Sequence, residues 1–206
     1  MTELAKDIQL RFPTSQISMV TKQKESDIDL LLISTEKRSH IQVLITDGLS
    51  DYEQPVPDKY STLKHIELYF CLPSYWDLND IDNPTMNWVQ PWIQKLARHL
   101  LENKTWYGVG HTFPNGNPVE AISPTMKQKY FLLNKPTYLS EELIPLVVNG
   151  KTIEFLGVVP IFEDELDYKM GKGTYKLQKK FLDKNITELL DDYRMSTLKN
   201  KWRIFR

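Results

Sequence analysis

Two apolar segments in the first third of the chain, each stopped by a sharp break, constrain the fold most strongly. In Ile41–Ser50 a run of β-branched and aliphatic residues ends at Asp47-Gly48, and in His65–Pro73 a similar run ends at a proline. Both runs place apolar side chains at every second position, which is the period of a strand with one buried face. Because proline has no N–H for a strand ladder, it marks the end of the second run. We therefore expect strands over residues 40–46 and 65–72.

Other parts of the chain predict further strands. Four segments carry a strand signal: residues 16–22, 27–34, 106–113 and 129–134. The signal is weakened in the third of them by Gly108 and Gly110. The clearest hairpin joins residues 144–148 to residues 152–160, because Asn149-Gly150 between them supplies the positive φ angles of a type I′ turn. These segments suffice for one large sheet.

Helices are expected in two places. The first covers Asn87–Asn103, where large apolar side chains recur every four residues. Asn87 is its expected N-cap, and Pro91 is tolerated because it falls in the first turn. The last quarter of the chain is expected to be helical over residues 162–170, 173–184 and 186–193. This order of elements predicts an α+β fold, an α/β sandwich in which helices flank a mixed, largely antiparallel sheet.

Length and charge limit the classes of protein to consider. The chain of 206 residues suits a single domain, with a core over about residues 25–190 and a basic C-terminal tail over 194–206. A net charge of −1 gives no overall attraction to nucleic acid or to an anionic membrane. Cys71 is the only cysteine, which excludes an intrachain disulfide. No spanning apolar run or secretory signal is visible, so we expect a cytoplasmic protein.

Residues that often carry catalysis are present, but not in a catalytic pattern. The four histidines are scattered, and no Cys-x-x-Cys or His-Glu-x-x-His occurs, so we expect no metal and no cofactor. Ser50 follows a strand beside Asp51, yet the Gly-x-Ser-x-Gly of a nucleophile elbow is missing. A hydrolase or transferase that uses His111 with the Asp47/Ser50 turn stays open as an alternative.

Lysine dominates the last part of the chain. Residues 169–184 hold six lysines against Asp183 alone, and residues 194–206 hold five basic residues interleaved with Trp202 and Phe205. Basic residues among aromatic ones are typical of nucleic-acid binding, which is a second alternative. A solvated helix face followed by a docked tail has the same composition. Because the rest of the chain is net acidic, an acidic protein partner would fit as well.

An ordered set of five segments resembles the suppressor-of-fused domain family. The segments are Ile45–Ser50, Glu67–Pro73 with Trp76, Trp92–Leu101, Gly110–Gly116 and Gly157–Leu166. The resemblance implies an α/β sandwich with a mixed sheet and no catalytic residues. It also implies a peptide clamp in animal members, which pair this domain with a second lobe. This chain is short for such a lobe and looks like the bacterial single-domain members, many of which are immunity proteins of toxin systems.

The leading hypothesis is therefore a non-catalytic protein-binding domain that neutralises a cognate toxin domain. Trp and Tyr dominate interface hot spots, so the expected contacts are aromatic or ionisable side chains in or beside loops. They are Asp51, Glu53, Tyr75, Trp76, Trp106 and His111. A strand with a free edge would offer a second mode, in which a partner adds a strand. The sequence leaves the oligomeric state open.

Overall fold

The computed structural model describes residues 2–20, 28–36, 40–80 and 82–198. Its strands are β1 (Gln16–Val20), β2 (Asp29–Thr35), β3 (Ile41–Asp47), β4 (His65–Pro73), β5 (Thr112–Pro114), β6 (Tyr130–Asn134), β7 (Leu146–Val148) and β8 (Lys151–Ile161). Its helices are α1 (Glu3–Arg11), α3 (Val89–Glu102), α4 (Glu163–Lys172) and α5 (Thr174–Asp183), with short 3₁₀ turns η1 (Leu49–Asp51) and η2 (Asp58–Leu63).

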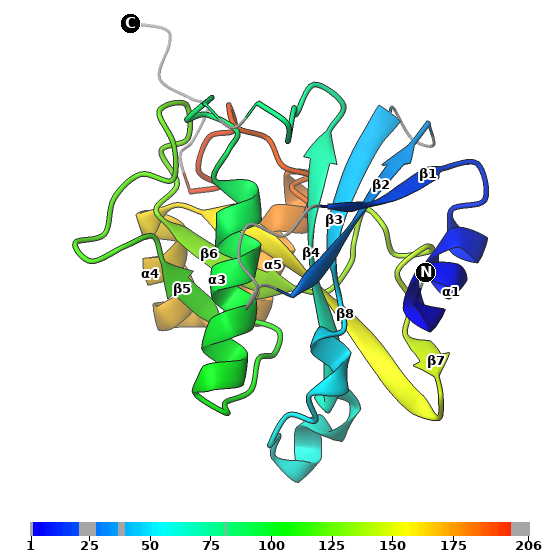
Figure 1. Ribbon diagram of the computed structural model, residues 1–206. Helices are drawn as coiled ribbons and strands as arrows, with labels where there is room; N and C mark the ends of the chain where they lie inside the picture. The colour runs from blue at the N-terminus through cyan, green and yellow to red at the C-terminus, as the bar shows by residue number, and fades with distance from the viewer. Residues whose placement is uncertain (1, 21–27, 37–39, 81, 199–206) are drawn as a thin grey trace, which may run out of the picture.

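All eight strands form one sheet in the order β1-β2-β3-β4-β8-β6-β5, with β7 paired to the start of β8. Strands β4 and β8 run parallel, whereas the other paired strands run antiparallel. Helices flank this sheet in a single domain (Figure 1). The expected fold class, an α/β sandwich with a mixed, largely antiparallel sheet, is confirmed.

Helices cover both faces of the sheet. Alternate residues of β4 divide between the faces, so that Phe70 packs with α3 while Tyr69 packs with α1. The other end of the second face is covered by α5, whose Leu177 and Phe181 lie against β6 and β8. In Figure 1, α3 lies in front of the sheet while α4 and α5 lie behind it.

An irregular segment, residues 186–198, follows α5, and we call it the strap. The helix expected over residues 186–193 is wrong. Strand β8 pairs with β4 only as far as Tyr69 and Gly157, and beyond Gly157 it pairs with β6. Further along β4, Leu189 of the strap lies where β8 would otherwise pair, and forms an isolated parallel bridge with Cys71. At this bridge the Leu190 N–H donates to the Cys71 carbonyl at 2.9 Å, so this backbone donor is satisfied by the sheet and not by a helix.

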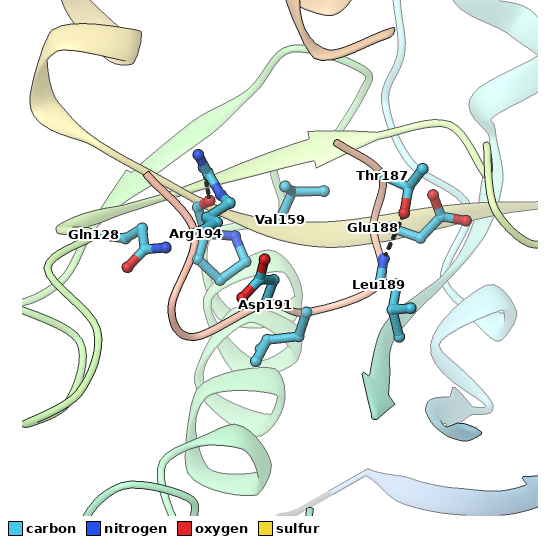
Figure 2. A pocket seen from close by; sticks show the side chains of 9 residues that line it. Gln128, Val159, Thr187, Glu188, Leu189, Asp191 and Arg194 are labelled. Carbon is cyan, nitrogen blue, oxygen red and sulfur yellow. Dashed lines mark hydrogen bonds between the residues drawn. The ribbon is translucent and has the colours of Figure 1, made fainter. Parts of the chain in front are cut away.

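A buried carboxylate anchors the strap. Glu188 is 1% exposed and accepts hydrogen bonds of 3.0 Å from the N–H groups of Thr137, Tyr138 and Leu139. The Tyr69 hydroxyl donates a further bond of 3.1 Å. Figure 2 shows Glu188 at one end of the strap, where it borders a pocket of about 10 Å³. The strap is thus tied both to β4 and to the segment after β6.

The second anchor is a buried ion pair. Arg194 lies on the opposite side of this pocket from Glu188 in Figure 2, and its guanidinium donates two bonds of 2.8 Å to the Glu165 carboxylate of α4. Glu165 also accepts from the backbone N–H of Thr197 at 2.8 Å. Of the basic tail predicted over residues 194–206, the part over residues 194–198 packs onto α4. Residues 199–206 lie outside the described part of the chain.

Several expected elements are confirmed. The hairpin between β7 and β8 has φ values of 50° at Asn149 and 78° at Gly150, as its turn sequence requires. The helices expected over residues 162–170 and 173–184 correspond to α4 and α5. Of the strands expected over residues 16–22 and 27–34, residues 21, 22 and 27 lie outside the described ranges, and the remainder correspond to β1 and β2.

Other expectations need correction. Helix α3 begins at Val89 and its cap residue is Trp88, which makes no side-chain capping bond, so Asn87 is not the N-cap. The strand expected over residues 106–113 is reduced to β5, which begins at Thr112. Helix α1 was not expected, although its N-cap Thr2 accepts a bond from the Ala5 N–H at 3.1 Å.

The Glu188 anchor gives a testable prediction. Glu188→Ala is expected to lower the free energy of unfolding by about 3 kcal/mol, because it leaves backbone donors without an acceptor. Urea denaturation followed by far-UV circular dichroism measures this loss. Glu102→Ala, at an exposed position in the last turn of α3, is the control and should stay within about 0.5 kcal/mol of the wild type. Equal stability of both variants would contradict the assigned role.

Candidate interaction surface

The six expected contact residues do not form one site. Asp51 and Glu53 precede the start of β4, whereas Tyr75 and Trp76 follow its end. This strand has nine residues and spans about 30 Å. The two groups therefore lie at opposite ends of the sheet.

Of the two expected contact residues after β4, only Tyr75 is exposed. Trp76 is 1% exposed, its indole N–H donates to the Met86 carbonyl at 3.1 Å, and its ring packs edge-on against Trp88. As a partner contact Trp76 is therefore wrong, because the core already surrounds it. Tyr75 is 52% exposed, and its hydroxyl donates to the Asp192 carboxylate of the strap at 2.6 Å.

The group before β4 is brought close to the segment that follows α3. Gln54 is buried, and its side-chain oxygen accepts from the Tyr107 N–H at 2.7 Å. The Tyr52 hydroxyl donates to the Thr105 carbonyl at 3.2 Å. These bonds place the loop of Glu53 beside the loop of Trp106 and His111. Glu53 itself is exposed and pairs with Lys64 at 2.7 Å.

Three rings in contact form the most distinctive surface feature, which we call the aromatic platform: Tyr60, Trp106 and His111. The Tyr60 and Trp106 rings are stacked, whereas Trp106 and His111 meet edge to face at an interplanar angle of 62°. The Trp106 ring centroid lies 5.1 Å from that of Tyr60, at an interplanar angle of 29°, and 4.5 Å from that of His111. The Lys59 ammonium lies 4.8 Å from the centre of the Tyr60 ring. Tyr60 is 38% exposed, and Trp106 and His111 are half-buried. The platform can present apolar ring surface beside a cation.

Two glycines hold the platform in place. A Cβ on Gly108 would lie 2.8 Å from the Trp106 ring, so any side chain there would displace the indole. Gly110 has a φ of +91°, and a Cβ on it would lie 2.5 Å from the Thr174 hydroxyl at the start of α5. These close approaches and the positive φ also explain why residues 106–111 do not continue β5.

The environment of His111 keeps its imidazole neutral. Burial lowers the pKa of His111 below its ordinary value of 6.5, and the nearby Lys169 ammonium lowers it further. At neutral pH the ring is therefore uncharged, with one donor and one acceptor nitrogen.

Sequence reasoning found Trp106 and His111 but missed Tyr60. Tyr60 lies in a proline-containing polar stretch that reads as an ordinary loop, and its contact with Trp106 joins residues far apart in the chain. An exposed aromatic residue within a polar loop was the available signal.

The Asp47/Ser50 turn has a structural explanation. Ser50 is 6% exposed, and its N–H donates to the Glu67 carboxyl at 3.0 Å. The Gly48 N–H donates to the same oxygen at 3.1 Å, and the Thr46 hydroxyl bonds to the other oxygen. Glu67 is fully buried, and this burial raises its pKa from 4.5 to about 7. The turn is thus fastened to β4 by a buried carboxyl.

The pocket beside this turn does not include His111. It has a volume of about 340 Å³, and Asp47, Ser50, Asp51 and Lys151 are among its lining residues. Asp51 is exposed and pairs with Lys151 at 3.3 Å. Since His111 packs on Trp106 instead, this pocket does not bring His111 together with Asp47 and Ser50, as the hydrolase or transferase alternative requires.

Within the described ranges, no three His, Cys, Asp or Glu side chains are grouped so that they could hold a metal ion. The same part of the chain contains no helix long and apolar enough to cross a membrane.

The fold and this surface together define an α/β sandwich that presents a preformed face. The family model described as Suppressor of fused protein (SUFU) matches residues 24–195, and the chain belongs to this family. No curated protein matches the chain.

Two similar solved structures share the fold. The first, described as the Sufu-Fu complex crystal structure, has 16% sequence identity and a TM-score of 0.68, and the alignment covers 94% of this chain and 90% of that one. The second, Suppressor of Fused from Drosophila, has 18% identity and a TM-score of 0.67, with 94% of this chain and 50% of that one covered. The chain thus spans about half the length of the Drosophila protein.

The buried Glu67 carboxyl predicts a pH dependence. A raised pKa in the folded state means that stability is greatest below the unfolded pKa of 4.5 and falls as the pH rises to about 7. Glu67→Gln retains an acceptor for both N–H groups and gains a donor for Thr46, so it mimics the protonated acid. Urea denaturation should show that the wild type loses on the order of 3 kcal/mol more than Glu67→Gln between about pH 5 and about pH 8. Parallel profiles would contradict this.

The platform predicts a change in the titration of His111. Trp106→Ala should raise the pKa of His111 toward 6.5, because water then reaches the imidazole and stabilises its charged form. NMR titration of the imidazole Cε1–H signal measures the pKa, with His111→Gln to assign the signal. Tyr193→Ala, at an exposed position on the strap, should leave the titration unchanged. An unaltered pKa in Trp106→Ala would show that the indole does not shield His111.

Proposed function

We propose that this chain is a non-catalytic protein-binding domain whose aromatic platform, with Glu53 beside it, contacts the partner. The observation that supports this proposal best is the cluster of contacting rings of Tyr60, Trp106 and His111, partly exposed and held by Gly108 and Gly110. Large rigid rings lose little conformational entropy on binding, which is why aromatic residues form most interface hot spots.

The family supports a binding role. A similar solved structure is that of a complex between Sufu and Fu. The chemistry of the chain also agrees, because burial raises the pKa of the Cys71 thiol and Ser50 is enclosed by the turn. A buried, protonated thiol is a poor nucleophile, so Cys71 is suited to packing.

A second contact is available at the edge of the sheet. Strand β1 pairs with β2 on one side and ends the strand order, so its outer edge can accept a partner strand. Met19, the fourth of the five residues of this strand, is 53% exposed. We propose strand addition at β1 as a supplement to the platform.

A toxin domain is the finer proposal for the partner. It rests on the resemblance to single-domain immunity proteins, as does the bacterial origin. The cytoplasmic location is a proposal that rests on the sequence, in which no spanning apolar run or secretory signal is visible. Nucleic-acid binding through residues 194–206 is less favoured, because the Arg194 guanidinium is engaged by Glu165.

Partner capture tests the proposal. The tagged protein is mixed with lysate of the organism that encodes it, captured proteins are identified by mass spectrometry, and the purified partner is titrated by calorimetry. Trp106→Ala should weaken binding by about 2 kcal/mol, or about 30-fold, since it removes a hot-spot ring. Tyr193→Ala, which removes an exposed ring elsewhere, should leave the affinity unchanged. Equal affinities for both variants and the wild type would place the interface away from the platform.

A further inference from the structure

Helix α5 has an exposed stripe that is both apolar and basic. Leu177 and Phe181 bury one side of the helix against the sheet. On the opposite side, Tyr175, Lys179 and Leu182 recur at intervals of four and three, which places them in one row. Tyr175 is 73% exposed and Leu182 is 74% exposed, although both are large. Such side chains on one helix face are a feature of interaction surfaces.

The end of α4 and the first turn of α5 carry further exposed side chains of both kinds. Met170 is 72% exposed, and Lys172 and Lys176 are exposed as well. We call the set the lysine face: Met170, Lys172, Tyr175, Lys176, Lys179 and Leu182. Lysine stems can cover apolar surface while their ammonium groups stay in water, so the whole face can enter one interface.

The acids of α4 do little to neutralise the lysine face. Glu163 pairs with Lys129 at 2.9 Å, Asp164 accepts from the Ser196 hydroxyl at 2.7 Å, and Glu165 holds Arg194. These three acids occupy the first turn of α4, whereas the lysines lie at its end and along α5. Asp167 and Asp183 are the remaining acids of the two helices. The face therefore stays positive in a chain whose net charge is −1.

We propose that the lysine face docks an acidic protein segment that carries apolar side chains. Carboxylates would complement the lysines, and apolar groups of the partner would cover Tyr175, Leu182 and Met170. A nucleic-acid backbone would satisfy the lysines but leave these apolar side chains in water. Because a stable interface needs about 800 Å² on each side, apolar and charged parts must both take part.

The junction of α4 with α5, from which the lysine face extends, lies beside the aromatic platform. Gly110 approaches Thr174, the first residue of α5, and Lys169 acts on the pKa of His111. A single partner can thus span both surfaces. This inference deepens the proposed function, on which it rests, because it names the charge and the apolar content of the partner.

A synthetic peptide tests the inference without the natural partner. The probe is a short fluorescein-labelled peptide of Asp and Glu with Leu and Phe at helical spacing, titrated by fluorescence anisotropy. Lys176→Glu/Lys179→Glu should weaken its binding by at least about tenfold, because each change replaces an attraction with a repulsion. Lys104→Glu/Lys127→Glu changes the net charge equally at two exposed positions elsewhere and should have little effect.

Three further measurements separate the possible occupants. A peptide of equal charge with Ser in place of Leu and Phe should bind at least about tenfold more weakly. Tyr175→Ser/Leu182→Ser should weaken the apolar peptide but not the Ser peptide. Single-stranded DNA of equal charge, or phosphatidylserine vesicles, should bind less tightly than the apolar peptide.

The results also distinguish this inference from the proposed function. Tighter binding of DNA or vesicles, or equal loss in the control variant, would overturn the docking of an acidic protein segment. Neither result would change the outcome of the capture experiment, which tests the aromatic platform through Trp106→Ala. Conversely, failure to capture any partner would count against the proposed function whatever the peptide does.

Discussion

The buried carboxyl of Glu67 is the interaction on which much of the structure depends. It joins β4 to the turn that ends β3, through the N–H groups of Gly48 and Ser50 and the Thr46 hydroxyl. Two of the segments that resemble the family, Ile45–Ser50 and Glu67–Pro73, are therefore parts of one hydrogen-bonded unit. The N–H groups of Gly48 and Ser50 bind the Glu67 carboxyl, and this structural role accounts for the turn without a catalytic one. It also sets the path of the chain toward the aromatic platform.

The strands that the sequence predicted correctly are those whose signal is local. In β3 and β4 the alternation of side chains reports burial directly, and in the β7–β8 hairpin Asn149 and Gly150 determine the turn. The errors arise where distant contacts override local preference. The spacing of Leu189 and Leu190 predicts a helix, but both residues instead pair with the free edge of β4 at Cys71, and the strap is therefore irregular. Gly108 and Gly110 interrupt an expected strand because Trp106 and Thr174 occupy the space of a side chain.

The candidate surface was only partly predictable for the same reason. Aromatic residues near loops indicated Trp106 and Trp76 equally, yet one lies on the surface and the other in the core. No local pattern separates them, since burial depends on how α3 and its preceding loop pack over the sheet. The contact between Tyr60 and Trp106 joins two loops that the sequence leaves unrelated. The lysines of α4 and α5 were visible in the sequence. That apolar side chains among them are exposed could be recognised only once the structure showed which side of α5 faces the sheet.

The parallel pairing of β4 with β8 has a consequence for how the chain assembles. Strands β1 to β4 follow one another in sequence, as do β5 to β8, and β4–β8 is the seam between these two halves of the sheet. Closing this seam joins His65 to Ile153, across a long loop whose entropy must be lost first. The strap then crosses the seam, with Leu189 on β4 and Glu188 on the segment after β6. Each half can form early from local contacts, whereas their union waits until β8 and the strap have been synthesised.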